Sequence, residues 1–275
     1  VLRAAERHPS FIIGGDLNEI GTGAVWDTHG ELFVVEADES DGTFLELPRR
    51  AALLTNAEPD HLEHYGGWPQ LEAAFERFVA ETPGPVVVGG DDAVAAAIGA
   101  RHGAVTFGTG EETTYRYEIL EATGRGSRLA IRVRGHAVGE VTLPVAGPHN
   151  AADAVGALAM GMELGCAFES CASALARFAG VARRFQHRGT VAGVTFVDDY
   201  AHLPTEVTAA LAAARWGDWQ RVVCVFQPHR FSRTASLWQD FGPVFGDADV
   251  VVVTDIYPAG ETPRPGISGS LVVEA

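Results

Sequence analysis

The sequence predicts an α/β protein in which a parallel sheet carries a small antiparallel insertion. Short apolar runs alternate with helical stretches along the first part of the chain, which is typical of a parallel sheet. Between about residues 106 and 145 the apolar residues instead recur at every second position, as they do in antiparallel strands. Strand and helix patterns then alternate again toward the C-terminus.

The elements of the first part follow from local patterns. Four short apolar runs are predicted to be strands, at residues 11–14, 32–36, 51–55 and 85–89. A helix is predicted over 70–81, because apolar side chains fall on one of its faces there: Leu71, Ala74, Phe75, Phe78 and Val79.

The insertion is predicted to contain strands at 115–119 and 129–133, with a glycine-rich turn at 124–126. The run G-P-H-N at 147–150 then begins a long, alanine-rich helix that is expected to end near Leu164.

An arginine-rich segment with glycines at its ends, residues 180–189, is predicted to be a hinge. Beyond it, three further apolar runs resume the strand and helix alternation, at 194–197, 222–226 and 250–253. We therefore predict two domains, 1–186 and 187–275.

The composition restricts the kind of function. The chain has 275 residues, of which 47% are apolar and 20% charged, so it can bury a sizeable core. Its formal charge of −16 argues against a surface for nucleic acid or anionic membranes, and it requires local cationic patches for anionic ligands. All 20 basic residues are arginine, which excludes lysine chemistry from this chain, including that of a phosphate-loop lysine.

The cysteine pattern favours a cytoplasmic protein with reduced thiols. The three cysteines, Cys166, Cys171 and Cys224, form no C-x-x-C pair, and their number is odd. No apolar run approaches the length of a membrane span, and no signal-peptide pattern occurs at the N-terminus. The oligomeric state is not predicted.

Acidic and imidazole groups follow two of the predicted strands. The run E-A-D-E-S-D covers 36–41, and T-N-A-E-P-D-H covers 55–61. In open α/β sheets ligands bind at the carboxyl ends of the strands. A carboxylate at the end of one strand and a carboxylate and imidazole at the end of the next would suit a divalent cation such as the Mg²⁺ of a nucleotide phosphate.

The segment G-T-G-E-E-T-T at 108–114 looks like a phosphate loop but is predicted not to be one. A phosphate loop has a lysine before its hydroxyl residue and a helix after it. Here glutamate takes the place of the lysine, and the following residues alternate like a strand. A nucleotide site would therefore need its main phosphate-binding element from outside this chain.

Seven motifs in order resemble the Mur ligases, in particular the members that add L-alanine to UDP-N-acetylmuramate. Besides the two acidic runs they are G-P-H-N at 147–150, R-R-F at 183–185, D-D-Y-A-H-L-P-T-E at 198–206, F-Q-P-H-R-F-S-R-T at 226–234 and A-G-E at 259–261. The resemblance spans essentially the whole chain. It implies a P-loop-NTPase-like central domain and a truncated Rossmann-like C-terminal domain.

The resemblance also implies an ATP-dependent amide synthesis with Mg²⁺. The lactyl carboxylate of UDP-N-acetylmuramate takes the γ-phosphoryl group of ATP, and the amine of L-alanine attacks the acyl phosphate. Two alternatives stay open. One is the recycling ligase that joins a murein tripeptide to the same nucleotide sugar, which the Q-P-H-R-F-S-R-T run disfavours. The other is a binding remnant without catalysis.

The resemblance implies metal and nucleotide roles for six residues. Glu36 and His61 match metal ligands, although histidine is an unusual ligand for Mg²⁺. His149 and Asn150 match residues that lie against adenine, and Arg184 and Asp199 match contacts to ATP. Ordinary structural roles compete: Glu36 as a solvated carboxylate, His61 as a helix-start residue and Asn150 as an N-cap.

Two further groups match residues of the reacting centre and of substrate binding. Tyr200 and His202 match positions near the reacting atoms, and Leu203 stands where the family commonly has a second histidine. A second set matches residues that bind the acidic substrates: His229, Arg230 and Arg233. The competing interpretation of the arginines is a solvated basic turn.

The isolated 275-residue chain is expected to show no L-alanine-dependent ATPase activity. Phosphoryl transfer needs the charge and metal contacts that a phosphate-loop lysine and hydroxyl supply, and this chain has no such loop. Phosphate release should be measured with ATP, UDP-N-acetylmuramate and L-alanine. Release that depends on L-alanine would contradict the prediction.

Overall fold

The computed structural model describes all residues from 1 to 275, and the chain divides into two compact units. The first unit consists of residues 1–121, 127–144 and 149–181. The second consists of residues 182–275 together with two short segments, 122–126 and 145–148.

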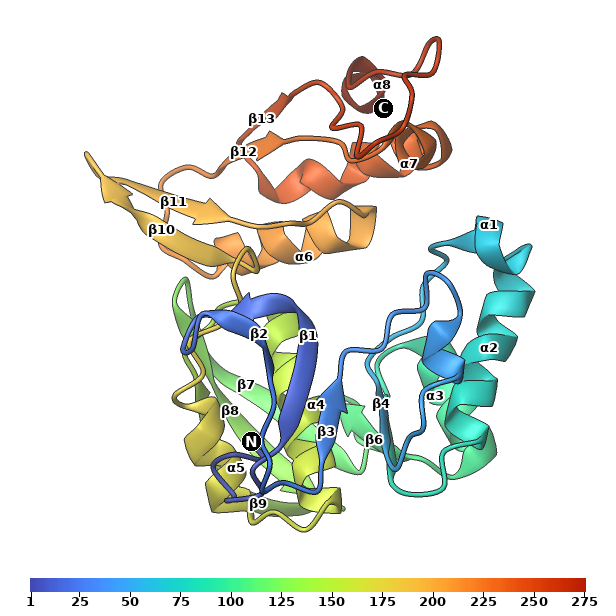
Figure 1. The fold of residues 1–275 in the computed structure, drawn as a ribbon. Helices are drawn as coiled ribbons and strands as arrows, with labels where there is room; N and C mark the ends of the chain where they lie inside the picture. Colours follow the sequence, from blue (N-terminus) through green and yellow to red (C-terminus); the bar gives the residue numbers. More distant parts are fainter. The chain divides into compact units, whose positions relative to one another are not determined.

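A six-stranded mixed sheet is the centre of the first unit (Figure 1). Its strands follow one another in space as they do in the sequence: β4 (Ala52–Leu54), β5 (Val86–Gly89), β6 (Val105–Gly108), β7 (Tyr115–Thr123), β8 (Gly126–Val133) and β9 (His136–Leu143). The pairs from β4 to β7 are parallel, and β8 pairs with β9 antiparallel. The predicted α/β class is thus confirmed, but the antiparallel strands extend the parallel sheet, and β6 within the predicted insertion is a parallel strand.

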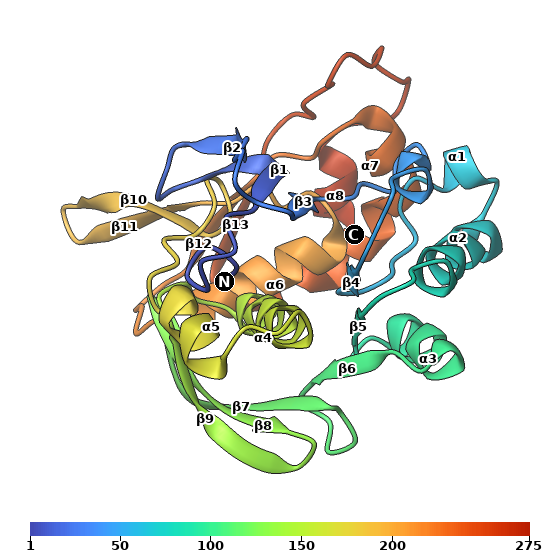
Figure 2. The same ribbon diagram turned by 60° about the horizontal axis from the view of Figure 1, so that its bottom comes forward.

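Five α-helices belong to this unit, and the second of them buries the apolar face that its sequence predicts. They are α1 (Leu62–Tyr65), α2 (Trp68–Ala80), α3 (Ala93–His102), α4 (Pro148–Glu163) and α5 (Phe168–Leu175). Helix α2 buries Leu71, Phe75 and Val79 in a cluster with Phe44 of the short helix η1 (Thr43–Leu45). Figure 2 shows α4 lying across the strands β7 to β9. Gly156 permits α4 to approach β6 closely, because a Cβ there would lie 3.0 Å from the ring of Phe107 in β6.

The first unit also contains a separate three-stranded sheet in the order β2-β1-β3. Strand β1 (Ser10–Leu17) pairs antiparallel with β2 (Thr22–Val25) and parallel with β3 (Phe33–Val35). The two strands that precede the acidic runs thus lie in different sheets, since β3 belongs to this sheet and β4 to the larger one. The periodicity and the length of apolar runs predict where strands occur, but the tertiary fold decides which strands pair.

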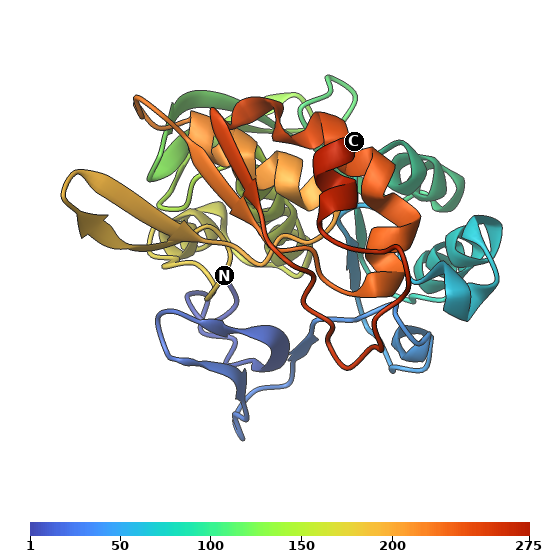
Figure 3. The ribbon, with the colours of Figure 1, turned by 90° about the horizontal axis from the view of Figure 1, so that it is seen from above.

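The second unit begins in the segment predicted to be a hinge. Strand β10 (Gln186–Val191) occupies the end of that segment and forms a hairpin with β11 (Val194–Asp198), visible in Figure 3. Strands β12 (Val223–Phe226) and β13 (Val250–Val253) form a parallel pair. The helices are α6 (Pro204–Arg215), α7 (Phe231–Leu237), η2 (Trp238–Asp247) and α8 (Ser270–Glu274).

The core of the second unit lies between the inner face of β12 and its helices. Val207 and Leu211 of α6, Phe226 of β12, Phe241 of η2 and Val272 of α8 form one buried cluster. The Phe226 and Phe241 rings are 5.1 Å apart. This packing fixes the carboxyl end of β12, which the functional residues follow. All three cysteines are free, as predicted, and no helix has the length and apolar character needed to cross a membrane.

Candidate functional site

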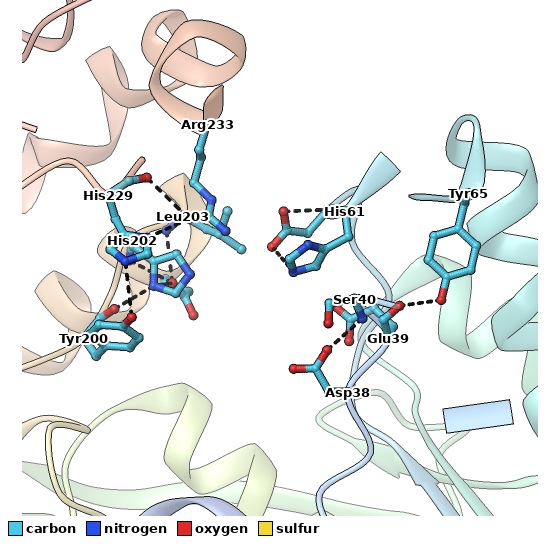
Figure 4. A network of polar contacts seen from close by, with 12 residues as sticks. Asp38, Glu39, Ser40, His61, Tyr65, Tyr200, His202, Leu203, His229 and Arg233 are labelled. Atoms are coloured by element: carbon cyan, nitrogen blue, oxygen red, sulfur yellow. Dashed lines mark hydrogen bonds and ion pairs between the residues drawn. The ribbon is translucent and has the colours of Figure 1, made fainter. Parts of the chain in front are cut away.

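Aromatic and imidazole side chains gather in the second unit, where two strands end (Figure 4). Tyr200 and His202 lie between β11 and α6, and His229 lies between β12 and α7. The His202 and His229 ring centres are 5.4 Å apart, and the Tyr200 ring lies 5.1 Å from His202 and 5.8 Å from His229. The structure thus brings together three residues that the sequence assigned to the reacting centre and to substrate binding.

The hydrogen bonds of His202 determine which ring nitrogen carries its proton. His202 Nδ1 lies 2.8 Å from the backbone carbonyl oxygen of Tyr200, which can only accept a hydrogen bond. Nδ1 is therefore protonated, and in the neutral ring Nε2 keeps its lone pair. The carboxylate of Glu206 lies 3.4 Å from Nδ1. The ring is thus oriented with Nε2 as the nitrogen able to accept a proton.

His229 has the opposite tautomer. Arg233 Nη1 lies 3.2 Å from His229 Nδ1, and a guanidinium can only donate, so Nδ1 is the acceptor. The proton is then on Nε2, which faces the Tyr200 hydroxyl at 3.4 Å. Burial lowers the pKa of His229, and so do His202 when it is protonated and the guanidinium groups of Arg233 and Arg230, whereas Glu261 opposes them. The Arg233 contact needs a lone pair on Nδ1, and the lowered pKa acts in the same direction, so both favour the neutral form of His229.

Glu206 holds the loop that carries His202, a role that the sequence analysis missed. Its Oε2 accepts hydrogen bonds from the backbone N–H groups of His202 at 2.8 Å and Leu203 at 3.0 Å. Its Oε1 lies 3.5 Å from Arg184 Nη1. Glutamate in the first helical turn, three residues after the N-cap, is the sequence signal that predicts such a contact.

The two arginines do not share one helix face. Helix α7 begins at Phe231, so Arg230 is its N-cap residue and Arg233 lies in its first turn. Arg230 has φ of 72°, a backbone conformation that residues with a Cβ atom adopt only at a cost. A spacing of three would place both arginines on one helix face only if the helix had begun by Arg230, and that condition is not met because the backbone turns at Arg230 before the helix starts. Arg230 is exposed, whereas Arg233 is partly buried against His229.

Asp199 is engaged in local structure. Its Oδ2 accepts the backbone N–H of Phe185, and its Oδ1 that of Ala201, each at 2.7 Å. The Arg183 guanidinium lies 4.9 Å from the centre of the Tyr200 ring. The predicted nucleotide contact of Asp199 stays a prediction. What the structure provides is a link between the R-R-F run and the loop that carries Tyr200.

The two predicted metal ligands lie in the first unit. Glu36 directly follows β3 and is exposed, and its Oε2 accepts the backbone N–H of Gly14 at 2.7 Å. His61 is the N-cap residue of α1, and its Nε2 lies 3.4 Å from Asp60 Oδ2. The structure therefore agrees with the alternative of a helix-start histidine. The described residues contain no group of three or more His, Cys, Asp and Glu placed to hold a metal ion.

The other acidic residues of the run at 36–41 build turns. Asp38 Oδ1 accepts the backbone N–H of Ser40 at 2.7 Å, and Asp41 Oδ1 accepts the backbone N–H and hydroxyl of Thr43 at the start of η1. The Tyr65 hydroxyl donates to the carbonyl oxygen of Glu39 (Figure 4). Burial raises the pKa of Glu39. These contacts explain the acidic run as a folded turn.

The predicted adenine pair lies at the start of α4. The Asn150 amide donates to His149 Nε2 at 3.1 Å. Because the helix begins at Pro148, Asn150 lies inside the first turn, and its interpretation as an N-cap is wrong. The side-chain contact keeps the two polar groups together at the helix start.

The glycine-rich segment 108–114 is a closed loop between two strands. It joins β6 to β7, with no helix after it. Asp91 accepts hydrogen bonds from the backbone N–H and hydroxyl of Thr109, at 2.9 to 3.2 Å. A carboxylate therefore occupies the backbone donor that a phosphate would need, and the prediction that this is not a phosphate loop is confirmed.

Comparisons with known proteins place this geometry in a family. The Mur ligase middle domain matches residues 23–161, and the Mur ligase glutamate ligase domain matches residues 183–274. The UDP-N-acetylmuramate–L-alanine ligase of Acidothermus cellulolyticus is 46% identical over 286 residues, covering 100% of this chain and 60% of that protein. That of Desulforamulus reducens is 43% identical over 272 residues, covering 97% of this chain and 59% of that protein.

Solved structures agree. The crystal structure of UDP-N-acetylmuramate–alanine ligase from Thermotoga maritima has a TM-score of 0.81 at 28% identity, covering 99% of this chain and 59% of that one. A murein peptide ligase from Psychrobacter arcticus shares the fold, with a TM-score of 0.63 at 21% identity, covering 100% of this chain and 62% of that one. The chain thus spans about 60% of the length of its relatives. The two domain matches and the identity along the whole chain show that this protein belongs to the Mur ligase family.

Proposed function

We propose that this chain belongs to an ATP-dependent ligase that joins L-alanine to UDP-N-acetylmuramate through an acyl phosphate. The observation that carries the proposal is the fixed pair of imidazoles beside Arg233, with Nε2 of His202 able to accept a proton. The identity of 46% to a ligase named for this reaction supports the same conclusion.

The chain's own groups suit the second half of that reaction. An amine must lose a proton as it attacks an acyl phosphate, and a neutral imidazole oriented through its other nitrogen is a suitable general base. His202 Nε2 is proposed to take that proton, and Glu206 beside Nδ1 stabilises the charged ring. Arg230 and Arg233 are proposed to bind the carboxylate of the amino acid, because a guanidinium matches carboxylate geometry.

The nucleotide part of the proposal rests on the residues that match the family's nucleotide motifs. Members of this family are ATP-dependent, and His149, Asn150, Arg184 and Asp199 are proposed to contact ATP. Mg²⁺ prefers oxygen ligands and is commonly held by one or two carboxylates together with phosphate oxygens and water. Glu36 fits such a role, since it is exposed and only its Oε2 accepts from Gly14. His61 is the less suitable ligand. The ion would neutralise charge on the phosphates.

The proposal can be tested with a chimaera. It carries these 275 residues in place of the matching part of the Acidothermus cellulolyticus ligase, which itself is the positive control. Phosphate release and amide formation should require ATP, UDP-N-acetylmuramate and L-alanine. Turnover with a murein tripeptide but not with L-alanine would instead favour the recycling ligase. A folded chimaera that releases no phosphate with either acceptor would favour a remnant without catalysis.

In the D-D-Y-A-H-L-P-T-E motif, Leu203 takes the place of the family's second histidine. Leu203 is the N-cap residue of α6, and its backbone N–H is held by Glu206 whatever its side chain. Leu203→His in the chimaera is therefore expected to change kcat by less than about tenfold, or roughly 1.4 kcal/mol in the barrier. Steady-state kinetics with L-alanine as the varied substrate measure the change. A much larger gain would mean that the protein has lost a catalytic group.

A further inference from the structure

A glutamate far along the chain is attached to the start of the arginine-bearing helix. Glu261 lies in the loop after β13, and its Oε2 accepts the backbone N–H of Ser232 at 2.9 Å. Its Oε1 accepts the Ser232 hydroxyl at 2.5 Å. Ser232 is the second residue of α7, between Arg230 and Arg233. One carboxylate thus satisfies a backbone donor that the first turn of a helix leaves without an intrahelical partner.

The same loop holds Arg230 on its other side. The Arg230 N–H donates to the carbonyl oxygen of Tyr257 at 2.8 Å, and the Tyr257 N–H donates to that of Pro228 at 2.9 Å. The Tyr257 ring stacks on His229, with ring centres 5.5 Å apart and planes 22° apart. A residue at φ of 72° keeps that conformation only when its surroundings hold it. The loop from Tyr257 to Glu261 provides that support.

Glu261 is ionised without neutralising Arg230. Burial acts against ionisation, but the Ser232 hydrogen bonds and the charge of Arg264 outweigh it, so the pKa of Glu261 lies below its usual value. Both carboxylate oxygens are engaged by Ser232. Arg230 forms no ion pair and is exposed, so its charge stays available to an anionic ligand.

We infer that Glu261 is a positioning residue, which acts through Ser232 to hold Arg230 and Arg233 for the carboxylate of the incoming amino acid. This inference rests on the proposed function for its substrate, but the attachment itself does not. The stacked ring and the backbone hydrogen bonds of Tyr257 hold the residues just before α7, and Glu261 holds the start of the helix itself. Loss of Glu261 should therefore loosen the start of α7 and weaken amino-acid binding while leaving the proton-accepting His202 in place.

The attachment is tested in the 275-residue chain by amide hydrogen exchange. In Glu261→Ala the Ser232 amide should exchange at least about tenfold faster, because it loses its acceptor. Glu274→Ala, at an exposed glutamate of α8, is the matched control and should leave that rate unchanged. If the Ser232 amide exchanges at the same rate in the parent chain, in Glu261→Ala and in Glu274→Ala, and the chain is still folded, the inference is overturned.

The functional consequence is tested in the chimaera. Glu261→Ala should raise the KM for L-alanine by at least about tenfold and change kcat by less than about threefold, the split expected when ground-state binding is lost. Adding Ser232→Ala to Glu261→Ala should have little further effect, because both remove one contact. A loss confined to kcat, or two fully additive effects, would overturn the positioning role. A chimaera inactive before any substitution would count against the proposed function instead, and the exchange result would stand.

Discussion

His202→Ala in the chimaera is expected to lower kcat by at least about 100-fold, the usual range for a lost general base. His202 Nδ1 donates to the Tyr200 carbonyl, and this leaves Nε2 as the nitrogen that can take a proton. His229 cannot replace it, because its Nδ1 accepts from Arg233 and its protonated Nε2 faces Tyr200. The measurement is steady-state amide formation at saturating L-alanine.

The control for this prediction is His136→Ala. His136 is an exposed histidine at the start of β9, outside the imidazole cluster, and its loss should leave kcat near that of the parent chimaera. Thermal unfolding of both variants separates a chemical effect from a loss of fold. If His202→Ala and Leu203→His both leave turnover unchanged, residues 198–206 do not belong to the reacting centre.

Glu36→Ala is likewise expected to lower kcat by at least about 100-fold without unfolding the chain, because a metal-binding carboxylate stabilises charge in the transition state. Glu36→Ala would also remove a hydrogen bond, since Glu36 accepts the Gly14 N–H. Glu36→Gln separates the two roles, because an amide oxygen can still accept from Gly14 but carries no charge. Both variants should lose activity if the charge matters.

The kcat of both Glu36 variants should be measured at saturating Mg²⁺ and ATP, and their thermal unfolding should be measured in parallel. Glu31→Ala, at an exposed glutamate just before β3, is the matched control. Near-normal turnover of Glu36→Ala would make Glu36 a surface carboxylate. Activity retained by Glu36→Gln alone would show that its hydrogen bond to Gly14, and not its charge, is what the enzyme needs.

Much of the fold was predictable because its signals are local. The apolar face of α2 and the run Val250–Val253 fall within a few residues of their predicted bounds. The family, too, was recognisable from short ordered motifs, and the domain matches confirm it. The sequence did not reveal that β3 and β4 belong to different sheets, because a short apolar run carries no information about which strand lies beside it.

By itself, the sequence determined the α/β class, the family and the residue types of the candidate site, since each depends on periodicity or on neighbouring residues along the chain. Only the tertiary structure decided the tautomers of His202 and His229, the turn at Arg230 and the attachment of Glu261 to Ser232. Each of these depends on a donor and an acceptor meeting within about 3 Å after the chain has folded. Glu261 and Ser232 are 29 residues apart, and no local pattern predicts that distance in space.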